Sequence, residues 1–188
     1  RLTQTRGCYR RAVKPVKPYL AVPTPHILAH RGLHTLAPEN TLAAFAAALD
    51  AGATHLETDA HCSADGIAVL VHDSEIVVGG RRVVIEELTA EQLAQLDLGS
   101  GEGVPALSDA LGKFPQASFN IDIKSPRAGA AVVTAVDHAE ARSRVLIASF
   151  RAARRSSTAR LLPGVATSSS ALVSLAAVLC ATLRLNRL

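Results

Sequence analysis

Short apolar runs alternate with segments of helical periodicity from about residue 26 onward. The apolar runs predict six strands, at about residues 27–30, 55–60, 68–72, 119–124, 145–150 and 164–168. The segments between them predict helices at about residues 41–51, 89–97, 107–113, 128–141, 152–162 and 171–183. Asn40 and Thr41 supply caps for the first helix, and Gly52 allows it to end in a left-handed conformation. Strands that alternate with helices favour parallel pairing through right-handed crossovers, and hence an α/β sheet or barrel.

The length of the chain limits how much of a barrel it can form. A closed barrel of eight strands takes about 250 residues, whereas this chain has 188 residues. We therefore predict an incomplete (β/α) barrel of the triosephosphate isomerase type, with about six of its eight strands. We expect an extended, basic, proline-containing lead-in over residues 1–25 and one barrel domain over 26–188, of which 151–188 is an atypical basic C-terminal part.

Charge is divided sharply along the chain. All sixteen acidic residues lie between Glu39 and Glu140, so both flanks are basic although the net charge is only +4. Aromatic residues make up 3% of the chain and tryptophan is absent, which leaves few platforms for stacked bases, so we expect no nucleic-acid partner. Solvated flanks are the favoured interpretation, and contact with an anionic membrane surface is the alternative.

Apolar segments and cysteines indicate the compartment. The longest apolar run, residues 171–183, is shorter than the roughly 20 residues of a membrane span, so no transmembrane segment is expected. No apolar signal-peptide core follows the basic residues near the N-terminus. Three cysteines at no metal-ligand spacing fit a reducing compartment, and we expect a cytoplasmic protein.

Carboxylates recur on two of the predicted strands. Glu57 and Asp59 project to the same side of one strand, because side chains alternate between its faces. Asp122 and Lys124 share the polar side of a second strand. A hard divalent cation with oxygen ligands would offset such carboxylates in an apolar segment. Taken singly, each pair also fits solvated acids on an edge strand or a weak surface ion pair.

Two histidines end apolar strands. His30, followed by Arg31, ends the first strand, and His72 ends the third. The carboxyl ends of parallel strands are where barrels keep their active sites. Histidine suits acid–base catalysis at neutral pH, and arginine offers a fixed fork of donors for phosphate. Four other histidines lack partners at informative spacing and are expected on the surface or in loops: His34, His55, His61 and His138.

These residues form an ordered set of motifs within residues 26–150. The set comprises His30-Arg31-Gly32, Ala37-Pro38-Glu39-Asn40-Thr41, Glu57-Thr58-Asp59, Asp65-Gly66 and His72-Asp73. In this order and spacing the chain resembles the glycerophosphodiester phosphodiesterase family. The resemblance implies a triosephosphate isomerase-type barrel. It also implies hydrolysis of small glycerophosphodiesters to sn-glycerol 3-phosphate and an alcohol in phospholipid metabolism, assisted by Mg²⁺ or Ca²⁺.

The same resemblance implies a role for individual residues. The implied metal ligands are Glu57, Asp59 and Asp122. The implied acid and base are His30 and His72. The implied phosphate contacts are Arg31 and Lys124. Glu39 lies in a family motif near the metal and is an assisting residue, although residues 38–41 equally serve to start a helix.

The chain departs from the family pattern at several places. Asp122 stands where the family usually has glutamate, and Val78 stands where it has arginine, so Arg81 and Arg82 are the nearest substitutes. The last two strands of the family have no counterpart. Two alternatives therefore stay open: a catalytically silent, truncated relative that acts as a binding module, and a phospholipase D of the toxin type that acts on lipids.

Overall fold

The computed structural model describes residues 19, 21, 24–35, 37–99, 101–169 and 182. The predicted lead-in over 1–25 falls outside the described residues except at positions 19, 21, 24 and 25. The predicted helix over 171–183 also lies outside them, apart from position 182. The two predictions are therefore not tested.

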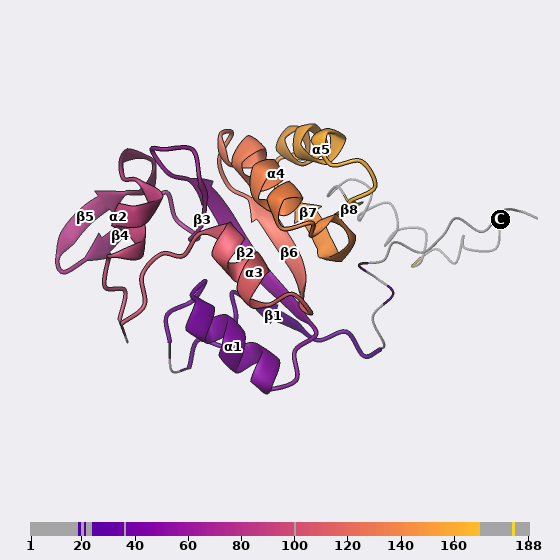
Figure 1. The fold of residues 1–188 in the computed structure, drawn as a ribbon, viewed down its shortest axis with the longest axis horizontal. Coiled ribbons are helices and arrows are strands. Elements are labelled where there is room, and N and C mark those ends of the chain that lie inside the picture. The colour runs from indigo at the N-terminus through magenta and orange to yellow at the C-terminus, as the bar shows by residue number, and fades with distance from the viewer. Residues whose placement is uncertain are drawn as a thin grey trace, which may run out of the picture.

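A mostly parallel sheet forms the centre of the molecule (Figure 1). Its parallel strands, in spatial order, are β1 (Leu28–His30), β2 (His55–Cys62), β6 (Ser118–Ile123), β7 (Val145–Ala148) and β8 (Ala166–Thr167). The helices in front of this sheet in Figure 1 are α1 (Leu42–Asp50), α3 (Leu107–Lys113), α4 (Ala128–His138) and α5 (Ala152–Leu161). Within the described part of the chain no strand joins β8 to β1. The fold is thus the predicted α/β class, an open part of a barrel.

Local sequence explains why α1 forms and where it packs. Five of its nine residues are alanine, the best helix former. The Thr41 side chain caps it by accepting a hydrogen bond from the Ala44 N–H. On its buried side, Phe45 meets Phe119 of β6 edge to face, with ring centroids 6.1 Å apart. Each such ring contributes about 1.5–3 kcal/mol through burial, which fixes the helix against the sheet.

The C-terminal end of α3 is held by Arg144. Arg144 is the last residue of the short 3-10 helix η3 (Arg142–Arg144), and its guanidinium donates to the carbonyl oxygens of Leu111, Phe114 and Ala117. Leu111 and Phe114 lie at the end of α3, where carbonyl oxygens lose their helical partners, and Ala117 lies just beyond it. The guanidinium also lies over the Phe119 ring, 5.7 Å from its centroid. One side chain thus ties α3 to the strand behind it.

The third predicted strand runs in the direction opposite to that expected. β3 (Ala68–Leu70) pairs with β2 antiparallel, with Ala60 opposite Leu70. The expected parallel crossover is therefore wrong for this strand. Only five residues, 63–67, separate it from β2, and a parallel connection needs a dozen or more. β2 extends past the end of β1 before the chain turns back into β3. The chain after β3 therefore lies beside Asp59, and the Val71 N–H donates to the Asp59 backbone carbonyl oxygen at 3.0 Å.

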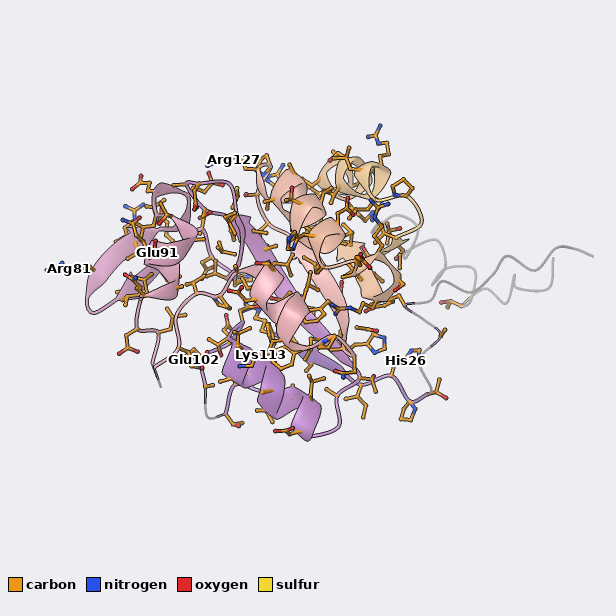
Figure 2. The ribbon with its side chains drawn as sticks, in the orientation of Figure 1. His26, Arg81, Glu91, Glu102, Lys113 and Arg127 are labelled. Atoms are coloured by element: carbon orange, nitrogen blue, oxygen red, sulfur yellow. The ribbon has the colours of Figure 1, made fainter. Side chains whose placement is uncertain are left out.

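A small lobe lies beyond this turn, and the sequence prediction missed its hairpin although it predicted the helix of the lobe at about residues 89–97. It comprises the hairpin β4 (Glu75–Val78) and β5 (Arg81–Val84), the 3-10 helix η2 (Ile85–Glu87) and α2 (Ala90–Ala94). The hairpin turns at Gly79 and Gly80, both with positive φ, as a two-residue turn that matches strand twist requires. Figures 1 and 2 show it projecting away from the main sheet, with Arg81 at its outer side. Its own core contains Val69, Ile85 and Leu93.

None of the helices in the described residues combines the length and apolar character that crossing a bilayer requires.

Candidate functional site

Strand register brings the polar residues of three strands to one edge of the sheet. His30 of β1 lies opposite Glu57 of β2. On the other side of β2, Glu57 lies opposite Asn120 and Asp59 lies opposite Asp122. The strands are parallel, so these positions all approach the carboxyl ends. Residues that are 27 to 92 positions apart in sequence therefore share one site.

Asp59 is the most buried charge in the site. Its side chain is only 2% exposed, and two cations flank it. Lys124 Nζ lies 3.0 Å from Asp59 Oδ1, and Arg31 Nε lies 3.0 Å from Asp59 Oδ2. Lys124 Nζ also lies 2.8 Å from Asp122 Oδ2 and so bridges the two carboxylates. Burial lowers the pKa of Lys124, but its hydrogen bonds to Asp122 and Asp59 outweigh that effect and raise the pKa above its ordinary value.

A strained turn after β1 aims Arg31 at Asp59. Arg31 has a φ of +56°, and Gly32 follows with a φ of +84°. A Cβ on Gly32 would lie 2.7 Å from the Ala44 carbonyl carbon, so only glycine lets the turn approach α1. The guanidinium donates to both carboxylate oxygens of Glu39, at 2.9 and 3.1 Å. Glu39 thus holds one end of the Arg31 fork while Asp59 contacts the other.

Glu57 sits between the charged pair and His30. Its Oε2 accepts from the Arg31 N–H at 3.2 Å and lies 3.8 Å from His30 Nε2. Burial, followed by the neighbouring Asp59 charge, raises the pKa of Glu57 to about 7, although the contacts with Arg31 oppose both effects. The His30 side chain is 67% exposed, so it faces solvent at the edge of the site.

His72 reaches the site by a route other than the one predicted. It follows the antiparallel strand β3, so the expectation that it ends a parallel strand is wrong. Its neighbour Val71 is bonded to the Asp59 backbone, which brings this segment to the same edge of the sheet. The His72 ring pairs with Asp73, with Nδ1 2.8 Å from Oδ1. The backbone at His72 thus lies beside the site, and the His72 ring faces Asp73.

Two further residues in contact with the site were missed as such by the sequence prediction. Asn40, which the sequence prediction offered as a helix cap and placed in a family motif without a role in the site, is buried and donates to Asp59 Oδ2. His61 is 4% exposed rather than on the surface, and its Nε2 lies 3.1 Å from the His72 carbonyl oxygen. Burial lowers the pKa of His61. The alternation of β2 was a usable signal, since it places His61 on the side of Glu57 and Asp59. His55, also expected at the surface, is buried against Tyr19.

The substitutes proposed for the missing family arginine do not reach this edge. Arg82 pairs with Glu75 across the hairpin, with Nε 2.6 Å from Oε2. Arg81 projects from the same hairpin away from the sheet (Figure 2). Neither residue therefore replaces that arginine in the part of the chain that the structure describes.

The donor set fits a hard cation, although lysine occupies part of it. Among the described residues, no group of three or more His, Cys, Asp or Glu side chains is arranged as a metal cage. Lys124 Nζ instead lies within 3.0 Å of one oxygen of Asp59 and one oxygen of Asp122. Asp122 Oδ1 and Asn120 Oδ1 are nevertheless buried and have no hydrogen-bond partner within the described residues. Such orphaned oxygens beside two further carboxylates are suitable ligands for Mg²⁺ or Ca²⁺.

Two curated relatives of this sequence are described as glycerophosphodiester phosphodiesterases. "Probable glycerophosphodiester phosphodiesterase 2" of Mycobacterium tuberculosis is 36% identical over 137 residues, which cover 72% of this chain and 52% of the relative. "Glycerophosphodiester phosphodiesterase" of Caldanaerobacter subterraneus is 32% identical over 140 residues, which cover 66% of this chain and 57% of the relative. The chain thus spans little more than half the length of these relatives.

Solved structures are similar in fold. A phosphodiesterase of Oleispira antarctica, solved in complex with the product sn-glycerol-3-phosphate, has a TM-score of 0.69 and 30% identity, covering 76% of this chain and 64% of that chain. A glycerophosphodiester phosphodiesterase of Agrobacterium tumefaciens has a TM-score of 0.68 and 28% identity, covering 77% of this chain and 66% of that chain. The sequence profile of the glycerophosphoryl diester phosphodiesterase family matches residues 30–177. The chain therefore belongs to the glycerophosphoryl diester phosphodiesterase family.

Proposed function

We propose that this chain hydrolyses glycerophosphodiesters to sn-glycerol 3-phosphate and an alcohol, with the help of a divalent cation. The observation that carries the proposal is the buried cluster in which Arg31 and Lys124 converge on Asp59 at the carboxyl ends of the strands. The descriptions of the relatives, and the product bound to the Oleispira antarctica enzyme, support this choice of substrate class.

Arg31 and Lys124 are proposed to bind the phosphate. A phosphodiester resists attack because its anionic oxygens repel a nucleophile, and fixed cations reduce that repulsion and stabilise charge in the transition state. Arg31 is suited to this task because Glu39 holds its guanidinium plane from the side. Glu39 thus assists by positioning Arg31. The Lys124 side chain is 17% exposed, so it is partly accessible to a ligand.

His30 and His72 are proposed as the acid–base pair. One imidazole takes the proton of the attacking hydroxyl or water, and the other gives a proton to the departing alcohol. In His72, a hydrogen on Nδ1 donates to Asp73 Oδ1, which leaves Nε2 free to exchange a proton with the substrate. His30 is exposed beside Glu57, so its ring is accessible to a ligand at the edge of the sheet.

Glu57, Asp59 and Asp122 are the proposed holders of Mg²⁺ or Ca²⁺. When bound, the ion would neutralise phosphate charge as a Lewis acid. Asp122 Oδ1, which has no hydrogen-bond partner among the residues that the structure describes, supports this assignment. Since Glu57 has a pKa of about 7, it must lose its proton to serve as a ligand, which favours ion binding above neutral pH.

The test is release of glycerol 3-phosphate from glycerophosphocholine by the 188-residue chain. The protein is assayed after dialysis against a chelator, and again after addition of Mg²⁺ or Ca²⁺. We expect no turnover in chelator and recovery with one of the two ions. Equal turnover with and without chelator would remove the metal role.

A binding-only function is the second candidate, and one observation favours it. Lys124 already neutralises Asp59 and Asp122, which is a stable arrangement without any ion. A chain of this kind would bind glycerophosphodiesters and release no product. Calorimetric titration with glycerophosphocholine, combined with the turnover assay, separates the two functions. Heat of binding without product in the presence of Mg²⁺ or of Ca²⁺ would support the binding module.

A further inference from the structure

Asn40 connects the first turn of the chain to the central carboxylate. It lies in the turn between β1 and α1, is 2% exposed and has a φ of +59°. Its Nδ2 donates to Asp59 Oδ2 at 3.1 Å. Its Oδ1 accepts from the Thr58 hydroxyl at 2.7 Å and from the Asp59 N–H at 3.3 Å. The side chain thus holds both the backbone and the carboxylate of Asp59.

The orientation of the Asn40 amide is set by its partners. A backbone N–H can only donate, so the amide atom that faces the Asp59 N–H must be the carbonyl oxygen. The amide nitrogen must then face Asp59 Oδ2, which accepts its hydrogen. A flipped amide would place two donors together at one end and two acceptors at the other. The network therefore permits one orientation.

The other end of Asn40 is equally fixed. Its backbone N–H donates to the Arg31 carbonyl oxygen at 3.0 Å. The next residue, Thr41, donates from its hydroxyl to the Pro38 carbonyl oxygen at 2.6 Å and caps α1. The turn is consequently anchored both to the Arg31 segment and to a buried helix. Through its side-chain hydrogen bonds to Thr58 and Asp59, Asn40 connects this anchored turn to β2.

The Asn40 amide is a neutral hydrogen-bond donor to Asp59, unlike the two cations beside it. The two Asp59 oxygens have different neighbours: Oδ2 meets Asn40 and Arg31, whereas Oδ1 meets Lys124. The Asn40 hydrogen bond restrains the plane of the carboxylate without adding another charge to a site that already holds two cations. Oδ1 is thereby kept on the side of Asp122. Partners of this kind commonly orient ligating carboxylates.

We propose that Asn40 is a positioning residue that fixes the orientation of the Asp59 carboxylate, so that Oδ1 points toward Asp122 and Lys124. The inference rests on the proposed function only where Asp59 is taken as an ion ligand. The orientation itself can be tested without turnover or metal.

The direct test is a crystal structure of the full chain carrying Asn40→Gly. Glycine accommodates the φ of +59° without strain and removes the amide. We expect the Asp59 carboxylate to rotate or occupy two orientations and to lose the 3.0 Å contact between Oδ1 and Lys124 Nζ. An Asp59 carboxylate in its original orientation would overturn the proposal, whatever the activity of the protein.

Ion affinity and kinetics give the second readout. Mn²⁺ binding followed by electron paramagnetic resonance, and kcat for glycerophosphocholine, should each fall about tenfold to hundredfold in Asn40→Gly, with a smaller change in KM. The matched control is Thr41→Ala, which removes the helix cap beside Asn40 but leaves the amide in place. It should lower Tm without lowering affinity or kcat more than about twofold. Equal losses in both variants would assign Asn40 a structural role only.

A second variant keeps the test decisive if Asn40→Gly folds poorly. Thr58→Val removes the hydroxyl that donates to Asn40 Oδ1 and nearly preserves side-chain shape. We expect a smaller loss of affinity than in Asn40→Gly, and no additional loss when the two substitutions are combined. Additive losses would contradict the proposed chain of contacts. A wild-type chain with neither Mn²⁺ binding nor turnover would refute the proposed function, and the Asn40→Gly structure would still decide the inference.

Discussion

At the scale of single residues, the site is a balance of buried charges around Asp59. Asp59 and Asp122 are almost fully buried, and Lys124 and Arg31 compensate them. Leaving one partner of such a set uncompensated costs about 3–5 kcal/mol. Each charge therefore contributes to stability as well as to the proposed chemistry.

Lys124→Met tests this balance. Removing the ammonium leaves Asp59 and Asp122 to repel each other in a buried place, so in chelator the free energy of unfolding should fall by about 3 kcal/mol. Mg²⁺ should restore part of that loss if the carboxylates bind it. Urea denaturation measures both effects. The control is Lys113→Met on the exposed side of α3, where we expect the free energy of unfolding to change by less than about 1 kcal/mol. A Lys124→Met protein as stable as this control would contradict the proposed charge balance.

The raised pKa of Glu57 predicts that the stability of the fold depends on pH. Its pKa rises from 4.5 in the unfolded chain to about 7 in the fold. Between these values the folded protein retains a proton that the unfolded chain releases, so stability falls as pH rises, by up to about 3 kcal/mol. Glu57→Gln should remove this loss. The measurement is the free energy of unfolding of both proteins in chelator at pH 4.5 and pH 8. If the difference between wild type and Glu57→Gln is the same at both pH values, the prediction is refuted.

The acid–base pair is tested by His30→Ala and His72→Ala. Each change should lower kcat for glycerophosphocholine by about 10²- to 10⁴-fold, because a positioned proton-transfer group contributes that much. Far-ultraviolet circular dichroism should remain that of the wild type. His34→Ala serves as the control, since His34 is exposed in the same connection and has no assigned role. Near-normal turnover in both test variants would refute the acid–base assignment.

At the scale of elements, the β1–α1 turn and the β2–β6 register build the site. The turn needs Gly32 because the chain passes against the Ala44 backbone with positive φ. The register places Asp59 beside Asp122. Both features were accessible from sequence: alternation gave the polar side of each strand, and the glycine after His30-Arg31 indicated a sharp turn.

Gly32→Ala separates close approach from backbone strain. The new Cβ would lie 2.7 Å from the Ala44 carbonyl carbon, so we expect a loss of about 2–4 kcal/mol, made up of strain and displaced backbone. Gly52→Ala is the matched control: its φ is +96°, but nothing lies within 4 Å of the added Cβ. That variant should lose only about 1–2 kcal/mol. Thermal unfolding measures the difference, and equal losses would show that crowding at Ala44 is unimportant.

The sequence prediction missed the direction of β3, the hairpin, and the contact between Asn40 and Asp59. An apolar run predicts a strand but not its direction, so β3 was given the parallel orientation of its neighbours. The connection of five residues was the signal to use, because it is too short for a crossover. Gly79-Gly80 between two short apolar runs likewise indicated the hairpin. Asn40 could not be assigned, since its partner Asp59 is 19 positions away and only the folded turn brings them together.

At the scale of the whole molecule, the described chain is an open part of a barrel with a complete row of charges at its edge. The parallel strands run from β1 to β8, and the proposed ion ligands lie on β2 and β6, which are neighbours in that order. The proposed ligands therefore depend on adjacent strands that are all present.

Divalent-ion binding to the intact chain tests the central claim most directly. Mn²⁺ is titrated into the wild-type protein and into Asp122→Asn, and free Mn²⁺ is measured by electron paramagnetic resonance. Convergence of carboxylates from two strands predicts one bound ion per wild-type chain, displaced by Mg²⁺, and an affinity at least tenfold weaker in the variant. Wild-type and Asp122→Asn chains that bind Mn²⁺ equally, or a wild-type chain that binds none, would contradict it.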